Sequence, residues 1–195
     1  MLEVIKTRRS TRKFKKDAVP AEMLETVVEA GRLAPTGMNE QATHFIAITN
    51  PEVLKNLKNL VMQEFAKMAG HEDLDKSAKN SVDQSVNGTY AFFYDAPALI
   101  LTANRTDNSN GLPDCSCAME NMMLMANALD LGSCWINQLR KLNDNEVITE
   151  YLRTLGLEEN EKVYASLALG FADTEDGLPN REEYVRKGNP VTFVK

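Results

Sequence analysis

The stretch that decides the fold is DCSCAMENMMLMANALDLGSCWIN, residues 114–137. From Cys115 to Leu131 the apolar residues fall on nearly every side of a helix, and charge enters only at Glu120 and Asp130. This pattern predicts a helix surrounded by protein rather than a surface helix with one buried stripe. Its four methionines could form an adaptable wall of a binding site, but the commoner role of such residues is to fill the core.

The ends of this helix carry signals of their own. Pro113 and Asp114 suit a helix start, because proline fits the first turn and a carboxylate lies near the positive end of the helix dipole. Gly132 suits the stop, since glycine adopts a left-handed cap without strain. Residues 134–136 predict a short apolar strand, and residues 137–138 are polar again. A buried helix that leads into a strand end is a common place for a ligand.

Length and composition describe an ordinary globular protein. The 195 residues suit a single domain, 1–195, of which 43% are hydrophobic and 26% charged. The net charge of -6 argues against general binding to nucleic acid or to an anionic membrane. Three cysteines make no disulfide framework, and no apolar run approaches the ~20 residues of a membrane span. Because no secretory signal precedes the first charges, we expect a cytoplasmic protein.

A basic segment near the N-terminus departs from the acidic average. Seven of the eleven residues 6–16 are Lys or Arg. A solvated charge run or a targeting signal is the usual explanation for such a segment. Ser10 and Thr11, however, place hydroxyl groups among the arginines, and Phe14 is an apolar anchor. Arginine forks with a hydroxyl suit a phosphate monoester, because their hydrogen bonds to it are charge-assisted.

Periodicity and turn signals divide the rest of the chain into short elements. We expect helices near residues 2–5, 20–34, 51–68, 74–86 and 143–155, a polar turn at 36–41, and strands at 45–49, 97–103, 163–171 and 191–194. The thin apolar stripe of 74–86 is typical of an exposed or mobile helix, which makes it a candidate substrate lid. The apolar residues 191–194 follow a polar arm, which indicates a strand that reaches a second subunit.

Side chains that catalyse reactions by themselves are scarce. The chain has two histidines, His44 and His71, and neither has metal-ligand spacing with a cysteine. Cys115 and Cys117 form one pair without the second pair that a zinc site needs. No glycine loop for phosphate is present, and no feature supports a Cys–His nucleophile. If the protein is an enzyme, we expect its reactive group to come from a cofactor.

Separated motifs, in the expected order, resemble the FMN-dependent nitroreductase family. They are Arg8-x-Ser10-x-Arg12-x-Phe14, Ala34-Pro35-Thr36-Gly37-Met38-Asn39-Glu40-Gln41, Leu131-Gly132-Ser133-Cys134-Trp135-Ile136, Leu169-Gly170-Phe171 and Arg186-Lys187. Together they span nearly the whole chain. The departures are Ala42-Thr43, where many members have Pro-Trp, Thr36-Gly37 in place of a pair of small residues, and Asp130, at a position often held by glycine.

The resemblance implies an α+β fold with a central mixed β-sheet flanked by helices. It also implies an interlocked homodimer that binds one FMN at each subunit interface. The buried helix would then lie at the dimer core, and the C-terminal strand would be exchanged with the sheet of the partner subunit.

The resemblance also assigns FMN contacts to particular residues. For the phosphate it implies Arg8, Arg9, Ser10, Arg12, Arg186 and Lys187. For the flavin ring it implies Pro35, Thr36, Asn39 and Gln41 of the other subunit, together with backbone N–H groups of Asn137 and Gln138 near N5 and O4. Arg12 is the candidate cation beside the N1–O2 edge, where negative charge grows on reduction. No side chain is expected to act as acid, base or nucleophile.

The implied function is an NAD(P)H oxidoreductase that reduces nitroaromatic, quinone or similar electron-poor acceptors by ping-pong hydride transfer through flavin N5. NADH and NADPH both remain as donors. Other readings keep the flavin: reductive dehalogenation, flavin reduction for another enzyme, oxidation of a peptide or small metabolite, or a non-enzymatic FMN-binding redox protein. A nucleic-acid adaptor that uses residues 6–16 is the least favoured reading and requires salt-dependent binding to DNA.

Overall fold

The computed structural model describes residues 1–182, 184–185 and 187–195, and a four-stranded sheet forms its centre. The strands are β1 (His44–Ile48), β2 (Ala98–Arg105), β3 (Gly132–Ile136) and β4 (Glu161–Gly170), in the spatial order β1-β2-β4-β3. The central strands β2 and β4 are buried along most of their length, as expected where helices cover both faces of a sheet.

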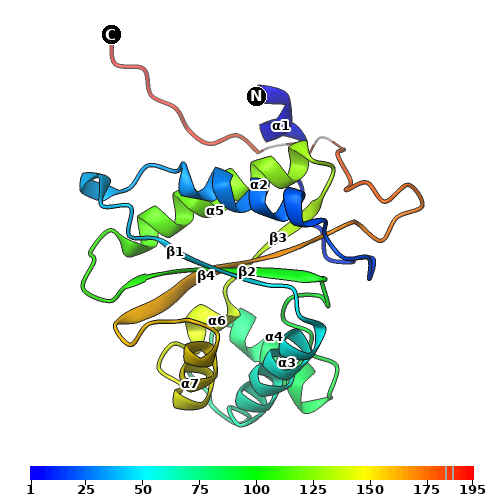
Figure 1. The fold of residues 1–195 in the computed structure, drawn as a ribbon, viewed down its shortest axis with the longest axis vertical. Helices are drawn as coiled ribbons and strands as arrows, with labels where there is room; N and C mark the ends of the chain where they lie inside the picture. The colour runs from blue at the N-terminus through cyan, green and yellow to red at the C-terminus, as the bar shows by residue number, and fades with distance from the viewer. Residues whose placement is uncertain (183, 186) are drawn as a thin grey trace.

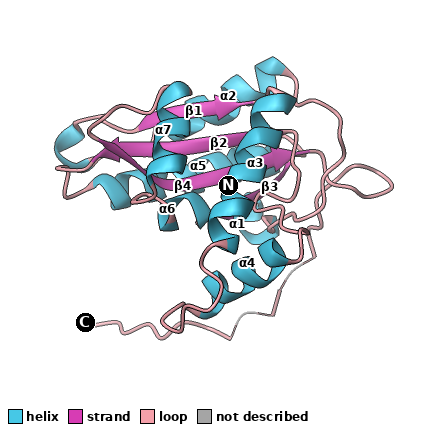
Figure 2. Ribbon diagram, turned by 90° about the horizontal axis from the view of Figure 1, so that it is seen from below, coloured by secondary structure: helices cyan, strands magenta, loops and turns pink. Residues whose placement is uncertain are grey.

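Helices form a layer on each face of the sheet (Figure 1). The first layer holds α1 (Leu2–Thr7), α2 (Ala21–Arg32) and α5 (Gly111–Ala128); the second holds α3 (Pro51–Ala66), α4 (Lys76–Val86), α6 (Gln138–Lys141) and α7 (Glu146–Thr154). Figure 2 shows α3 and α7 crossing the strands on the second face. Each layer has its own hydrophobic core against the sheet, and the methionines of α5 dominate the first.

The α+β architecture is confirmed, but the sheet is not mixed as expected. Within the described ranges, every pairing between strands is antiparallel. Parallel pairing occurs there as one isolated bridge between Ser10 and Ser133. The reason is the path of the chain, because neighbouring strands run in opposite directions. A mixed sheet would need a further strand that runs parallel to one of them.

Local signals predicted most element types correctly and several boundaries less well. Asn50 caps α3 as expected, its side chain accepting from the backbone N–H of Glu52 at 2.9 Å. The helix expected at 143–155 begins instead after Asn145, which caps it. Asn143 is unavailable as a cap, because its side-chain amide pairs with the backbone of Val163 in β4. The four-residue α6 was not predicted, since one turn leaves no periodic pattern.

The methionine-rich helix is confirmed as α5, with two corrections. It ends earlier than predicted, and Asp130 rather than Gly132 takes the left-handed backbone, with φ 61°. Gly132 lies in β3, where an added Cβ would come within 2.7 Å of the Thr11 side chain. Nor is α5 surrounded on all sides in this chain, because a strip that includes Cys117 and Glu120 is exposed.

The chain after β4 forms no helix or strand within the described residues, and its last segment trails away from the body (Figure 2). The strand expected at 191–194 is therefore absent from this chain. Val191, Phe193 and Val194 are 70%, 82% and 92% exposed, which is unusual for three large apolar side chains. None of the helices in the described ranges combines the length and apolar composition needed to span a bilayer.

Candidate functional site

The basic loop, residues 8–14, lies against the ends of β3 and β4 and is held there by its main chain. Ser10 forms a parallel bridge with Ser133, and Thr11 donates its backbone N–H to the Ser133 carbonyl at 2.9 Å. Phe14 is buried and forms an antiparallel bridge to Ala172. Backbone pairing therefore fixes the path of the loop from Ser10 to Phe14.

These side chains surround a hollow of about 340 Å³. Its lining consists of Arg8, Arg9, Ser10 and Arg12 from the basic loop, with Asn180 and Tyr184 from the tail. Three guanidinium groups and no carboxylate are found among the described lining residues, so the hollow attracts anions. The structure thus brings together four of the six residues that the sequence assigned to a phosphate.

Arg9 serves partly to shape the basic loop. Its Nη1 donates to the carbonyl oxygens of Lys6 and Arg8, at 2.7 Å each. The guanidinium carbon lies 5.0 Å from the centre of the Tyr184 ring, within cation–π range. The Nε of Arg9 is buried without a hydrogen-bond partner in the part of the chain that the structure describes. An anion in the hollow is one group that could satisfy this donor.

Arg12 lies between Tyr94 and Cys134. Burial acts to lower the pKa of the Arg12 guanidinium, but contact with the Tyr94 hydroxyl and the neighbouring thiol outweighs it, so the pKa is raised and Arg12 stays charged. Burial raises the pKa of the Cys134 thiol, although Arg12 and Ser10 act against that shift. Cys134 is 3% exposed and therefore packs as a neutral thiol beneath the hollow.

The far end of α5 holds the segment that leads into the basic loop. The Asn127 side chain donates to the Val4 carbonyl and to the Thr7 hydroxyl, at 3.0 Å each. Arg181 of the tail donates to the Asn127 carbonyl and to the Asp130 carboxylate, at 2.6 Å each. α1 and the tail are therefore both fastened to the same turn of α5.

The tail was predicted to supply Arg186 and Lys187 to this site. Arg186 lies outside the described residues, and Lys187 is exposed. Arg181 is the tail base that makes contacts in the structure, and it was missed because its partners are more than fifty positions away. Tyr94 was missed for a similar reason, since a lone tyrosine before a strand gives no sign that it will face an arginine.

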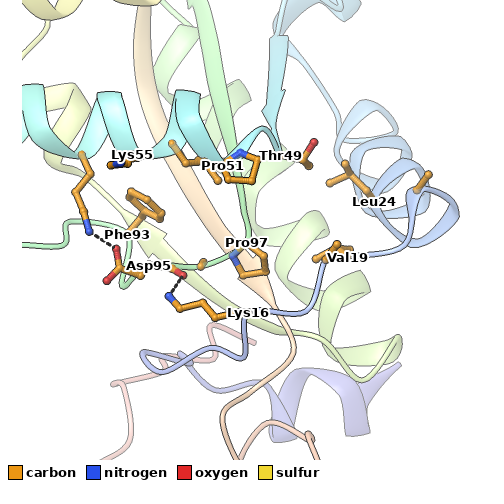
Figure 3. A pocket seen from close by; sticks show the side chains of 14 residues that line it. Lys16, Val19, Leu24, Thr49, Pro51, Lys55, Phe93, Asp95 and Pro97 are labelled. Atoms are coloured by element: carbon orange, nitrogen blue, oxygen red, sulfur yellow. Dashed lines mark hydrogen bonds and ion pairs between the residues drawn. The ribbon is translucent and has the colours of Figure 1, made fainter.

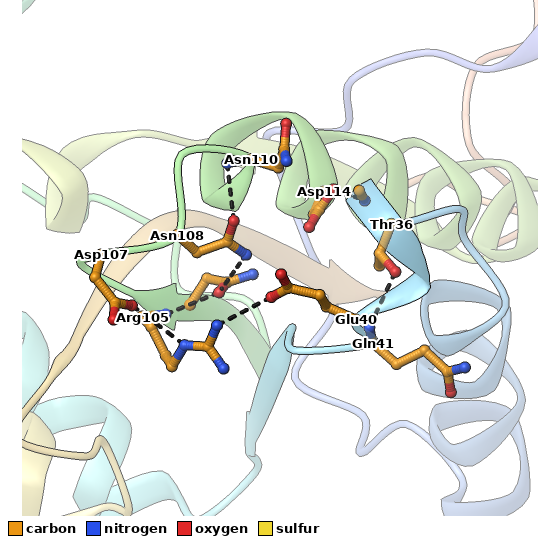
Figure 4. A network of polar contacts seen from close by, with 10 residues as sticks. Thr36, Glu40, Gln41, Arg105, Asp107, Asn108, Asn110 and Asp114 are labelled. Atoms are coloured by element: carbon orange, nitrogen blue, oxygen red, sulfur yellow. Dashed lines mark hydrogen bonds and ion pairs between the residues drawn. The ribbon is translucent and has the colours of Figure 1, made fainter.

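The turn, residues 36–41, has an unusual backbone (Figure 4). Three residues of the turn that are not glycine have φ angles in the left-handed region: Met38 at 53°, Asn39 at 55° and Gln41 at 51°. The Thr36 hydroxyl accepts from the Gln41 N–H at 3.0 Å, and the Gln41 amide donates to the Asn39 side chain at 3.2 Å. Gly37 donates its N–H across the fold to α5. Pro35 leads into the turn from α2.

The predicted residues after β3 lie beside a second hollow. The Asn137 side chain accepts from the Trp135 indole at 2.7 Å, and the Asn137 N–H donates to the Gln138 side chain at 3.1 Å. Gln138 then lines a polar hollow of about 370 Å³ whose other walls are α4 and residues 89–95. In that wall Tyr90 bonds to Ser81 at 2.7 Å, and burial raises the pKa of Tyr90 to about 12.

Two groups of the predicted site residues, in the basic loop and in the turn, lie at opposite ends of α5 (Figure 1). Asn127 holds α1, which leads into the basic loop, and Asp114 holds the turn. At a rise of 1.5 Å per residue, these two positions are roughly 20 Å apart along the helix axis. One chain therefore does not bring the turn and the basic loop around a single ligand.

A larger hollow lies elsewhere, at the start of α3 and just before β2 (Figure 3). It measures about 500 Å³ and none of the predicted site residues lines it. Its walls include Val19, Leu24 and Phe93, and Lys16 and Lys58 reach the backbone and carboxylate of Asp95 beside it. Volume favours this hollow as a binding site, whereas positive charge and the buried unpaired Nε of Arg9 favour the hollow beside the basic loop.

No group of three or more His, Cys, Asp or Glu side chains in the described residues could hold a metal ion.

Among solved structures, a nitroreductase with bound FMN from Bacteroides fragilis is 36% identical to this chain. The two superpose with a TM-score of 0.86, and the match covers 100% of this chain and 98% of that one.

Curated relatives carry related names. A protein from Methanothermobacter thermautotrophicus, provisionally named an NADH dehydrogenase/NAD(P)H nitroreductase, is 29% identical over 139 residues, which is 69% of this chain and 59% of that protein. One from Archaeoglobus fulgidus with the same provisional name is 28% identical over 174 residues, or 89% and 86%. The profile of the nitroreductase family matches residues 5–171. The chain belongs to the nitroreductase family.

Proposed function

We propose that the chain is an FMN-dependent NAD(P)H oxidoreductase that works as a homodimer. The observation that carries this proposal is the hollow lined by Arg8, Arg9, Ser10 and Arg12. Burying a phosphate requires several cationic hydrogen-bond donors, and the buried unpaired Nε of Arg9 fits that requirement. The similar structure from Bacteroides fragilis contains FMN, which supports the same ligand here.

FMN, when bound, would supply the redox chemistry, which is hydride transfer through N5 between NAD(P)H and an electron-poor acceptor. The protein supplies binding and orientation. Arg8 and Ser10 hold the phosphate, and Arg12 places a permanent positive charge beside the flavin. A nearby cation stabilises the negative charge of a reduced flavin and so raises its reduction potential. The backbone after β3, at Asn137 and Gln138, would face the N5 edge.

Two chains are needed to complete the site. The turn lies roughly 20 Å from the basic loop along α5, so Pro35, Thr36, Asn39 and Gln41 would serve the flavin held by the partner subunit. The exposed strip on α5 and the exposed apolar side chains of 191–194 are surfaces that a second copy would cover. A terminal strand added to the sheet of the partner would also supply the mixed pairing that one chain lacks.

The polar hollow beside Gln138 is the proposed acceptor pocket. Hydroxyl and amide side chains line it, among them Tyr90, Gln84 and Gln138, and such groups can donate to a nitro or carbonyl oxygen. The α4 helix forms one wall, so its opening and closing would control entry. Nitroaromatics and quinones are planar acceptors with oxygen atoms that suit such a wall.

Steady-state kinetics of the FMN-loaded protein test this function. We expect NADH or NADPH to be oxidised when a nitroaromatic or a quinone is present, with parallel double-reciprocal plots, because one site serves donor and acceptor in turn. A halophenol assay beside it identifies a dehalogenase. Intersecting plots would contradict the ping-pong order, and bound FMN without turnover would instead indicate a redox sensor or store.

A further inference from the structure

The turn, residues 36–41, needs an external support. Left-handed φ angles are rare for residues with a side chain and cost free energy, and Met38, Asn39 and Gln41 all have them within four positions. Its internal hydrogen bonds, two between backbone groups and two exposed ones that involve side chains, do not connect it to the rest of the fold. A backbone of this kind persists only where neighbouring parts of the fold hold it.

The first support is Asp114, in the first turn of α5. Its Oδ1 accepts the backbone N–H of Gly37 at 2.9 Å. The Asp114 side chain is only 4% exposed, and its second oxygen accepts no hydrogen bond from the described residues. A buried carboxylate is costly to keep, and its one hydrogen bond to the described residues is to the turn.

The second support is a side-chain network at the start of α5 (Figure 4). Arg105 donates to the Glu40 carboxylate at 2.9 Å and also to Asp107, at 3.2 Å. The space above Gly37 is filled by Asn110, because an added Cβ would come within 2.4 Å of its amide. The turn is thus clamped at Gly37 and at Glu40, on either side of Asn39.

We propose that Asp114, assisted by Arg105, is a positioning residue that preorganises the turn for the flavin ring of the partner subunit. This inference rests on the proposed function. Neither residue touches the flavin in this account; each fixes the backbone from which Asn39 and Gln41 project. The same helix holds the approach to the basic loop through Asn127, so α5 sets the spacing between both halves of the site.

Hydrogen exchange in the FMN-free protein tests the clamp by itself. Asp114→Ala should speed exchange at the amides of residues 37–41 about tenfold, since a hydrogen bond to a buried carboxylate is lost. Asp114→Asn retains an oxygen acceptor and should restore most of the protection. The matched control is Asp107→Ala, which removes the more exposed of the two carboxylate partners of Arg105. Unchanged exchange in Asp114→Ala would overturn the proposal.

Binding of FMN and of riboflavin then tests what the clamp serves. If the turn meets the ring, Asp114→Ala weakens both ligands by the same factor, about tenfold or more, and shifts the visible circular dichroism of the bound flavin. Asp114→Asn should recover both readouts. Wild-type affinity for both ligands in an Asp114→Ala protein whose turn has loosened would overturn the proposal. Failure of the wild-type protein to bind FMN would instead remove the proposed function.

Discussion

The basic loop and the turn are held in different ways. Backbone contacts fix the basic loop: Thr11 pairs with Ser133, and Lys15 donates its N–H to the Phe171 carbonyl at 2.9 Å. Side chains fix the turn, chiefly through Asp114. Substitution of Arg8 or Arg12 should therefore change ligand binding without moving the loop, whereas the Arg9 side chain also bonds to the loop backbone. A single substitution beneath the turn should move the turn itself.

The largest expected effect comes from the basic loop. Arg8→Ala should weaken FMN binding about tenfold to a hundredfold, because a charge-assisted hydrogen bond contributes about 1.5–3 kcal/mol. Riboflavin, which has no phosphate, should bind almost as before. Fluorescence titration of both flavins measures the difference, with Lys13→Ala as the control from the same loop. Equal losses for the two flavins would mean that the loop had moved.

A substitution that blocks the backbone contact should displace the same loop. Gly132→Ala places a methyl group within 2.7 Å of the Thr11 side chain. We expect a loss of unfolding free energy of about 1–3 kcal/mol, the usual cost of overpacking, together with weaker FMN binding. Urea denaturation of the FMN-free protein measures the first quantity. Full stability would show that the basic loop can shift without cost.

Like the turn, the α4 helix is held by side-chain contacts. Asp75 caps α4 and pairs with Lys141 of α6 at 2.8 Å. The hydrogen bond from Lys141, followed by the cap, lowers the pKa of Asp75. A group whose pKa is lower when folded stabilises the fold above its unfolded pKa, and this contribution is lost as the pH falls through the folded value.

Protection of the α4 amides should therefore be constant near neutral pH and fall below about pH 4. Hydrogen exchange corrected for the intrinsic rate measures it, and Asp75→Asn should show the low-pH behaviour at pH 7. The buried amides of residues 98–103 in β2 serve as the internal reference. Equal loss of protection in α4 and β2 would indicate global unfolding instead.

The smallest effect is expected at the exposed end of the clamp. Arg105→Ala breaks the ion pair with Glu40, in which both side chains are about two-fifths exposed. Exposed pairs contribute about 0.2–1 kcal/mol, so FMN affinity should fall only about two- to fivefold. A loss as large as that of Asp114→Ala would move the main support of the turn from Asp114 to Arg105.

The sequence predicts the features of this fold that depend on neighbouring residues. It does not predict those that depend on contacts between residues far apart in the chain. Asn50 as a cap and the burial of the α5 methionines follow from neighbouring residues alone. The left-handed position at Asp130 was placed at Gly132, because only packing reveals that glycine is needed there to admit Thr11.

The candidate site divides in the same way. Arginine and serine spacing predicted the anion hollow beside the basic loop. Asp114 was read as a helix-start residue, because its partner Gly37 is 77 positions away. The terminal strand could not be located from one chain, since residues 191–194 find no partner strand within it.

The central claim is that the hollow beside the basic loop binds FMN, and the visible absorption spectrum of the purified protein tests it most directly. We predict two flavin bands and, on heating, release of FMN at about one molecule per chain. A colourless protein that also fails to take up added FMN would contradict the claim.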